Sequence, residues 1–534
     1  MARASRRMGS ADSLWLTMDR PTNLMVITSV VLLESRPDWD AVLDVLRTRL
    51  VDPHPVFRER SRHRRRPFGA HRWEEDPDFD LAHHVHRATL SGAATDGGGG
   101  AGSEGSEGGA GSESGAGGQA DAELQAYVEE HLPRPFDRSR PLWEVHLVDG
   151  PGAGAALVFR IHHALADGIA LTRVLLGLTE DADGVPGDLV GPGPTPGIAA
   201  LPVAALPLGQ AGKTRGGVLA AGLRLARAGL RSSRMQLRDK GAHRVVVDAA
   251  TATATVALRT GQVVGDVLLT SNPESAVGGV PGHRKRVLWT APLPLTGLKQ
   301  VGRLVGATLN DVLLSAVAGA LHTYQRESGR SPVDLATMVP VDVRPLDEPL
   351  PRELGNRFAL LFLRFPSGDA TPLGRLAVCK ARMDWLKASP EAALTFGLLS
   401  VIGRVPAGLQ RRFVDFFADK AIGVTTNVAG PREPRRLAGV PVTGVLGWVP
   451  GSGRHTVGFC IVTYDGAVRI GIMADDAEVP EPERLLTALE DEVALLVRIG
   501  AAGTDDAAGA GGAGAARPGG RGRRSPHRAA FRRS

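Results

Sequence analysis

The chain is poor in cysteine and has no long apolar run. Of its 534 residues only Cys379 and Cys460 are cysteines, and they lack the spacing of metal ligands. This argues against a disulfide framework or a zinc site and fits a reducing compartment. No apolar run approaches the ~20 residues that span a bilayer. Residues 1–16 lack the apolar core of a secretory signal, so we expect a cytoplasmic protein.

Positive charge is concentrated in two segments. The net charge is +6, and residues 517–534 hold seven arginines and no acid, while residues 58–66 hold six more arginines. Basic clusters favour anionic partners such as phosphate-bearing ligands or anionic lipid. Zinc-finger spacing, an RNP motif and interleaved aromatic residues are all missing. We therefore do not expect a nucleic-acid partner.

A chain of this length exceeds one hydrophobic core, so we expect two domains. The composition predicts an N-terminal domain over 1–183, a connecting segment over 184–285, a C-terminal domain over 286–500 and a tail over 501–534. An insertion at about 91–120 is nearly all Gly, Ser, Ala and Glu, and the tail is Gly, Ala and Arg. Neither composition builds a core, so both segments are expected to be disordered.

Strand and helix patterns mix in both domains, which indicates an α/β or α+β class. Apolar runs predict strands at 26–33, 155–161, 287–294, 359–365 and 457–463. Alternation predicts a further, half-buried strand that begins at Trp143. Helical spacing predicts helices at 40–50, 169–178, 308–324 and around 485–496, with Thr308 as an N-cap.

The most specific signal is the motif HHxxxDG at residues 162–168 (HHALADG), between a strand-like run and a helix-like run. Two histidines at the end of a strand can present a neutral imidazole at the mouth of an active site. An imidazole is the side chain best suited to take a proton near neutral pH. The motif therefore indicates general-base chemistry.

With this motif the chain resembles the bacterial wax ester synthase/diacylglycerol acyltransferase family, which belongs to the CoA-dependent acyltransferases. Further motifs agree in order: 11–13 (ADS), 21–25 (PTNLM), 73–85 (WEEDPDFDLAHHV), 141–143 (PLW), 310–311 (ND), 340–344 (PVDVR) and 426–431 (TNVAGP). The resemblance implies two domains like chloramphenicol acetyltransferase, with a substrate tunnel between them. The insertion, the connecting segment and the tail have no counterpart in this motif set.

His162, His163, Asp167 and Gly168 form the candidate catalytic set of the motif. By the same resemblance His163 is expected to be the general base that activates an acceptor hydroxyl. Within the set, a structural role is the stronger expectation for His162. Asp167 either caps the helix that begins at Gly168 or pairs with an arginine, of which Arg344 is one candidate. No G-x-S-x-G motif is present, so we expect direct transfer without an acyl-enzyme.

Candidate substrate-binding residues come from the other motifs: Pro141, Leu142, Trp143, Asn310, Asp311, Thr426 and Asn427. Thr426 and Asn427 are candidate donors to the oxyanion of the tetrahedral intermediate. For Trp143 a core position is the stronger expectation. The Asn310–Asp311 pair also fits a plain helix N-terminus, where short polar and acidic residues are favoured.

The resemblance implies an acyl-CoA-dependent O-acyltransferase that forms triacylglycerol from diacylglycerol, with wax ester from a long-chain alcohol as a second activity. No cofactor is expected, because acyl-CoA is the substrate. Two alternatives stay open. One is a condensation-type enzyme that takes its acyl group from a carrier protein, and the other is a non-catalytic protein associated with lipid bodies.

Two further segments bear on possible partners. At residues 218–234 four arginines share one helical face, which suits an interfacial helix on anionic lipid as well as it suits a solvated helix. We expect peripheral contact with the inner face of the plasma membrane or with lipid bodies. His83, His84 and His86 have no carboxylate or cysteine partners at metal-binding spacing. A solvated or loop role is expected for them, and no metal site.

Overall fold

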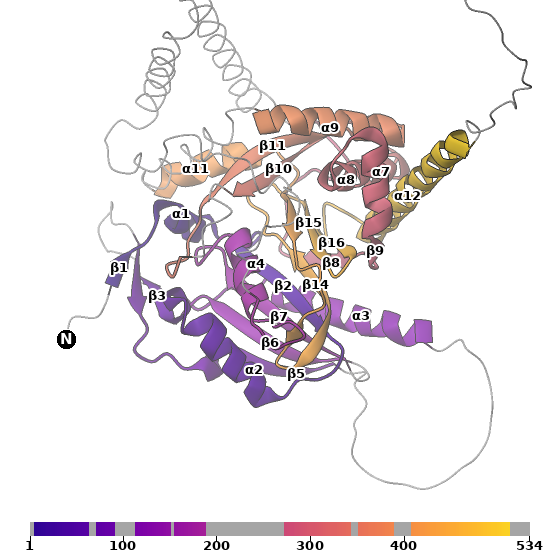
Figure 1. Cartoon of the computed structure of the whole chain (residues 1–534). Helices are drawn as coiled ribbons and strands as arrows, with labels where there is room; N and C mark the ends of the chain where they lie inside the picture. The colour runs from indigo at the N-terminus through magenta and orange to yellow at the C-terminus, as the bar shows by residue number, and fades with distance from the viewer. Residues whose placement is uncertain are drawn as a thin grey trace, which may run out of the picture.

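The computed structural model describes residues 5–62, 71–90, 113–150, 154–187, 272–342, 351–388 and 407–512. The helices are α1 (Ser10–Met18), α2 (Trp39–Val45), η1 (Leu46–Val51), η2 (Pro55–Arg58), η3 (Leu81–His83), α3 (Glu113–His131), α4 (Gly168–Gly177), α7 (Leu295–Val305), α8 (Leu309–Glu327), α9 (Pro372–Ala388), α11 (Ala407–Ala418) and α12 (Pro482–Gly512). We call the described residues up to 187 the N-lobe and those from 272 onward the C-lobe. The N-lobe carries α1 to α4, and the C-lobe carries α7 to α12 (Figure 1).

Strands account for the rest of the regular structure. They are β1 (Ser5–Arg7), β2 (Val26–Leu33), β3 (Glu59–Arg62), β4 (Arg72–Glu75), β5 (Val85–Thr89), β6 (Trp143–Asp149), β7 (Ala155–His162), β8 (Lys285–Trp289), β9 (Leu293–Pro294), β10 (Leu335–Asp342), β11 (Phe358–Phe365), β12 (Thr425–Ala429), β13 (Arg436–Leu437), β14 (Val440–Trp448), β15 (Val457–Tyr464) and β16 (Ala467–Asp475). Helices and strands mix in both lobes, so the expected α/β class is confirmed.

The N-lobe is built on a six-stranded sheet in the order β13-β14-β2-β7-β6-β5. β7 pairs antiparallel with both β2 and β6, and every one of its residues is buried. Its continuous apolar run is what a central strand with two covered faces requires. The motif that begins at His162 therefore follows a central strand that is buried along its whole length.

The second face of this sheet lies under α3. Leu124 and Val128 of α3 pack on Val148 and Val158 of the sheet. Consequently β6 is buried along almost its whole length, and the half-buried strand expected there is wrong. Its alternate polar positions, including His146, lie beneath a helix and not in solvent.

The two lobes share this sheet. β14 comes from the C-terminal part of the chain and pairs antiparallel with β2, so that Trp448 lies opposite Thr28. β13 extends the same sheet beyond β14. The boundary drawn from composition near residue 286 is thus crossed by a segment that returns to the N-lobe.

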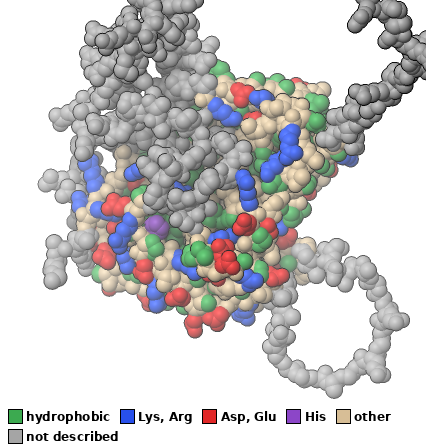
Figure 2. Space-filling model, viewed as in Figure 1, with side chains coloured by type: hydrophobic (Ala, Val, Ile, Leu, Met, Phe, Trp, Pro, Cys, Tyr) green, Lys and Arg blue, Asp and Glu red, His purple; other side chains and the backbone are tan. Residues whose placement is uncertain are grey.

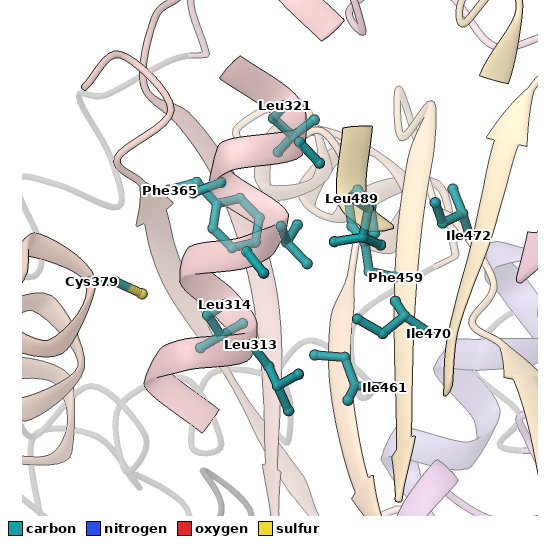
Figure 3. Packing of buried hydrophobic residues seen from close by; sticks show 14 of the residues in the cluster. Leu313, Leu314, Leu321, Phe365, Cys379, Phe459, Ile461, Ile470, Ile472 and Leu489 are labelled. Atoms are coloured by element: carbon teal, nitrogen blue, oxygen red, sulfur yellow. The ribbon is translucent and has the colours of Figure 1, made fainter. Parts of the chain in front are cut away.

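The C-lobe packs around α8. A five-stranded sheet in the order β12-β15-β16-β8, with β9 added beside β16, lies on one side of this helix, and the β10–β11 pair and α9 lie on the other. Figure 3 shows Leu313 of α8 pointing toward Ile461 of β15, and Leu314 on the side of α8 that faces Phe365 and Cys379. The expected N-cap is confirmed, because Thr308 forms a capping box with Asp311.

Several expected boundaries differ in the structure. The helix expected at 40–50 is α2 followed by the π-helical turn η1. The strand expected at 287–294 is interrupted between β8 and β9. α3 begins at Glu113, inside the insertion expected to be disordered, and α12 continues to Gly512, past the expected start of the tail. Segments 218–234 and 517–534 lie outside the described residues.

The described surface mixes both signs of charge. Acidic and basic side chains are interspersed on the face seen in Figure 2. Of the arginine-rich segment 58–66, Arg58 pairs with Asp52, and Arg60 and Arg62 both pair with Glu74. These three arginines are therefore already matched by acids of the same lobe.

No single helix in the described ranges is long and apolar enough to cross a membrane. Taken together, α7 and α8 are long and apolar enough for a membrane span, but the two helices are bent by 100° relative to each other.

Candidate active site

An apolar cavity of about 200 Å³ lies where the two lobes meet. α1, β2 and α4 line it from the N-lobe, and β11, α11 and β12 line it from the C-lobe, with β14 between them. Most lining side chains are aliphatic or aromatic, as in Leu171, Phe362 and Phe413. Such walls suit a hydrocarbon chain and give few partners to a charged group.

His163 lines this cavity directly after the end of β7. Its backbone N–H donates to the carbonyl of Met25 over 2.7 Å. Its ring stacks on Trp15 of α1, with the ring centroids 4.2 Å apart, and lies 5.7 Å from the ring of Phe358 on β11. Aromatic residues from both lobes therefore fix the plane of the imidazole.

Asn356 holds one nitrogen of that ring. Asn356 Oδ1 lies 2.9 Å from His163 Nδ1, and Asn356 Nδ2 donates to the His163 carbonyl over 2.8 Å and to Asp12 Oδ1 over 2.9 Å. A backbone carbonyl can only accept, so the amide must turn its nitrogen toward that carbonyl and its oxygen toward the ring. His163 Nδ1 therefore carries the proton and donates it to Asn356.

This arrangement leaves Nε2 of His163 with the lone pair. Burial lowers the pKa of His163 from 6.5 to about 4, so the ring is neutral near pH 7. A neutral imidazole with a fixed tautomer, set in the wall of a cavity, can accept a proton from a bound hydroxyl.

His162 is held in the opposite way and does not line the cavity. Its Nδ1 accepts from the N–H of Ala164, so its Nε2 carries the proton. Nε2 lies 3.1 Å from Asp19 Oδ2. Arg138 also donates to this carboxylate. Burial raises the pKa of Asp19, but the contacts with His162, Met25 and Arg138 outweigh burial and lower it overall. Both nitrogens of His162 are occupied, as a structural role requires.

Asp167 is the N-cap of α4, which was one of the two roles predicted for it; the other was a pair with an arginine. Its Oδ1 accepts from the N–H of Ala170, and its Oδ2 accepts from the N–H of Arg357. Asp167 thereby ties the motif to the segment that also carries Asn356. The other candidate partner, Arg344, lies outside the described residues.

Gly168 lines the cavity at the start of α4. A Cβ placed on it would meet no atom within 4 Å. Packing therefore does not require glycine here, and the missing side chain leaves cavity space close to His163.

Strand alternation separates Thr426 from Asn427. Thr426 lines the cavity, whereas Asn427 lies on the other face of β12 and donates to Asn310 Oδ1 over 2.9 Å. Asn310, Asn427 and Asp311 are not among the residues that line the cavity. Asp311 is occupied in the capping box of α8, so its contact with substrate is not supported.

The PLW motif lies in the core of the N-lobe. Leu142 and Trp143 are fully buried, and none of the three motif residues lines the cavity. The Trp143 ring N–H donates to the carbonyl of Phe57, and the Leu142 carbonyl accepts from the N–H of His162. The structure therefore places Pro141, Leu142 and Trp143 outside the cavity, and Leu142 bonds directly to the histidine motif.

Sequence reasoning did not find the residues that orient the two histidines. Trp15, Asp19 and Asn356 carry no motif of their own. Asp12 belongs to the motif at residues 11–13, but its hydrogen-bond partner Asn356 is 344 positions away along the chain. A single sequence gives no signal for such a pairing.

The histidines at 83, 84 and 86 have three different environments. His83 is exposed, as expected. His84 is not solvated: it is buried, and its ring stacks on Trp143 at 4.6 Å. His86 is half-buried on β5 and approaches Glu144 and His146 of β6.

Comparison with solved structures places the fold in a class. The chain is similar to the wax ester synthase/diacylglycerol acyltransferase from Marinobacter aquaeolei VT8, with 19% identity, a TM-score of 0.58 and coverage of 93% of this chain and 100% of that one. It is also similar to the first condensation domain of the calcium-dependent antibiotic synthetase, with 16% identity, a TM-score of 0.51 and coverage of 93% and 96%. The fold is therefore that of two-lobed acyltransferase and condensation domains.

Sequence comparison narrows the class. The model of the wax ester synthase/diacylglycerol acyltransferase catalytic domain matches residues 8–97 and 117–313, and the model of the WS/DGAT C-terminal domain matches residues 354–496. The chain is 26% identical over 493 residues to a protein of Mycobacterium tuberculosis (strain ATCC 25618 / H37Rv) described as a diacylglycerol O-acyltransferase, covering 90% of this chain and 93% of that protein. A second protein of that strain with the same description is 28% identical over 511 residues, covering 90% and 94%. The chain belongs to the wax ester synthase/diacylglycerol acyltransferase family and is an acyltransferase.

Proposed function

We propose that the protein transfers an acyl group from acyl-CoA to diacylglycerol, which yields triacylglycerol, and that it also esterifies long-chain alcohols. The observation that carries this proposal is a neutral His163 with its Nδ1–H held by Asn356 in the wall of an apolar cavity. The relatives described as diacylglycerol O-acyltransferases support the choice of acceptor.

The reaction follows from the state of His163. Nε2 of His163 takes the proton of the acceptor hydroxyl while that oxygen attacks the thioester carbonyl carbon. The tetrahedral intermediate collapses, the carbon–sulfur bond breaks, and the imidazolium returns its proton to the CoA thiolate. Atoms and charge balance without an acyl-enzyme, since the alcohol itself is the nucleophile.

The imidazolium formed during attack needs stabilisation. Burial makes a charged ring costly, as the low pKa of His163 indicates. The side-chain oxygen Oδ1 of Asn356 accepts from His163 Nδ1–H whether the His163 ring is neutral or charged. This hydrogen bond strengthens when the ring becomes charged. Thr426 is our candidate donor to the oxyanion, because its position on β12 lines the same cavity.

The acceptors and products are insoluble in water, so we infer peripheral contact with the inner face of the plasma membrane or with lipid bodies. The arginine-rich segments at 218–234 and 517–534 are the candidates for binding anionic lipid. Flotation with anionic liposomes, with and without residues 218–234, tests the first of these segments. Equal binding by both proteins would remove it.

An assay with labelled palmitoyl-CoA tests the activity, with diacylglycerol and hexadecanol offered separately and His163→Ala alongside. We expect triacylglycerol as the main product, a smaller yield of wax ester, and loss of both in the variant. Equal yields from the variant would contradict the role of His163 as the general base. Turnover of a carrier-bound acyl group, with none of palmitoyl-CoA, would favour a condensation-type enzyme instead.

A further inference from the structure

A second cluster of histidines lies on the face of the N-lobe sheet that α3 covers. β5 and β6 are parallel neighbours, and His86 lies opposite His146 in their register. Glu144 is two residues before His146, so strand alternation places it on the same face. The ring centroids of His86 and His146 are 5.0 Å apart, and one ligand atom from each of the three residues lies within 4.8 Å of the others.

The cluster is largely covered by its neighbours. His86 and Glu144 are half-buried, and His146 is buried. Glu144 also pairs with the buried guanidinium of Arg160.

His146 is the group whose bonding is incomplete. Only 6% of this residue is exposed, and its Nδ1 lies 2.6 Å from the hydroxyl of Tyr127 on α3. Its Nε2 is buried, forms no hydrogen bond among the described residues, and lies 3.3 Å from Glu144 Oε1. When Nδ1–H is donated to Tyr127, Nε2 presents its lone pair beside the carboxylate, where a cation can bind both groups.

We propose that His86, Glu144 and His146 bind one divalent transition-metal ion of the Zn²⁺ type. Two histidines and one glutamate are a ligand set used for zinc, with water in the remaining position. A histidine ligand commonly donates its other N–H to an outer partner, and the Tyr127 hydroxyl, 2.6 Å from His146 Nδ1, is placed to accept it. Zinc–nitrogen bonds are about 2.0–2.1 Å long, so the ligands must move together by roughly 1 Å, which side-chain rotation supplies.

Arg160 determines which cations fit. It pairs with Glu144 through Oε1 and stacks over Phe136 at 5.2 Å. Its charge cancels that of the carboxylate, so the site has no net negative charge to attract Mg²⁺ or Ca²⁺. Imidazole nitrogens bind Zn²⁺, Ni²⁺ and Cu²⁺ strongly and hard cations weakly, so selectivity for the former follows.

His131 is not a further ligand. Its ring lies 4.8 Å from that of His146, but its Nδ1 donates to the Tyr127 carbonyl and its Nε2 accepts from Arg134. The bound ion instead joins the edge strand β5 to β6 and, through Tyr127, to α3. His146 lies opposite Val158 of β7, well before the end of that strand at His162, so the expected effect of the ion is on stability and not on turnover.

Zinc binding to the tag-free, full-length protein tests the proposal after treatment with a chelator. Isothermal titration should give one Zn²⁺ per chain, and His86→Ala should weaken the affinity for Zn²⁺ at least tenfold. The control variant His83→Ala also loses one histidine, but His83 is exposed and outside the cluster, so its affinity should be unchanged. Substitution by Co²⁺ should give the visible absorption of a tetrahedral site, and Mg²⁺ should not compete.

The result that overturns the proposal is Zn²⁺ binding to His86→Ala as tight as to the unmodified chain, or no saturable binding at all. Competition by Mg²⁺ at equal concentration would also contradict it. His86 is half-buried, so its removal is expected to leave the fold intact, and circular dichroism of each variant checks this.

Discussion

The N-lobe sheet carries histidines at two places, and their surroundings give them different chemistry. His163 leaves β7 beside an apolar cavity, with an amide on Nδ1. His146 lies on β6 under a helix, with a tyrosine on Nδ1 and a carboxylate near Nε2. A neutral partner leaves His163 free to gain and lose a proton, whereas an adjacent carboxylate makes the second place suited to a cation. The residue type is shared, and the groups around the ring decide its role.

The sharpest test of this comparison removes one histidine from each place. His163→Ala should lower the turnover of palmitoyl-CoA by ~10²-fold or more, because general-base catalysis contributes that much. His86→Ala should leave turnover within about twofold and alter only metal-dependent stability. Initial rates and melting temperatures with and without Zn²⁺ measure both. A large loss of activity in His86→Ala would show that the two places are coupled.

A second test changes the amide that holds His163. Asn356→Ala removes the acceptor of Nδ1–H, so the ring can turn or adopt the other tautomer, and we expect kcat to fall by roughly 10–10²-fold with little change in KM. A pH profile separates positioning from misfolding. In the unmodified enzyme the pKa of about 4 predicts that kcat/KM stays constant from about pH 8 to pH 5 and falls only below that range. An acid limb near pH 6.5 would contradict the buried, neutral base.

A third test concerns the structural histidine. His162→Leu removes the donor to Asp19, so we expect a loss of ~1–3 kcal/mol in the free energy of unfolding and a smaller loss of activity than in His163→Ala. The pKa of Asp19 is lowered in the folded state, so its contribution is present above pH 3.8 and is lost as pH falls through the lowered value. Urea unfolding at pH 7 and pH 3 measures this, and the variant should show the smaller difference between the two.

The smallest expected effect is at Gly168. A Cβ fits without contact, so Gly168→Ala should leave the melting temperature equal or slightly higher, because alanine favours a helix start over glycine. The added methyl group takes space from the cavity next to His163. We expect a change in the preferred chain length of acyl-CoA, measured with donors of eight to eighteen carbons. An unchanged preference would mean that acyl chains do not pass this position.

The sequence predicted the parts of the fold that depend on local patterns. The apolar run of β7, the capping box at Thr308 and the cap at Asp167 are all encoded within a few residues. It also led to His163 through one short motif. These features were accessible because neighbouring residues along the chain determine them.

Other features depend on contacts between distant segments. β6 alternates like a half-exposed strand, and only the position of α3 shows that its polar face is covered. The Asn356–His163 contact joins residues 193 positions apart, and the His86–His146 pair depends on the register of two strands. Thr426 and Asn427 looked equivalent in the sequence, and only the direction in which β12 faces the cavity separates them.

The pairing of β14 with β2 also determines how late in synthesis the N-lobe sheet can be completed. The two strands are about 400 residues apart, so at ~5–20 residues per second the ribosome needs roughly 20–80 s to supply the partner. Until then β2 is an edge strand, and its apolar side chains such as Val30 and Val31 lack their neighbours. A truncated N-lobe would keep that open edge permanently, so it would aggregate where the whole chain folds.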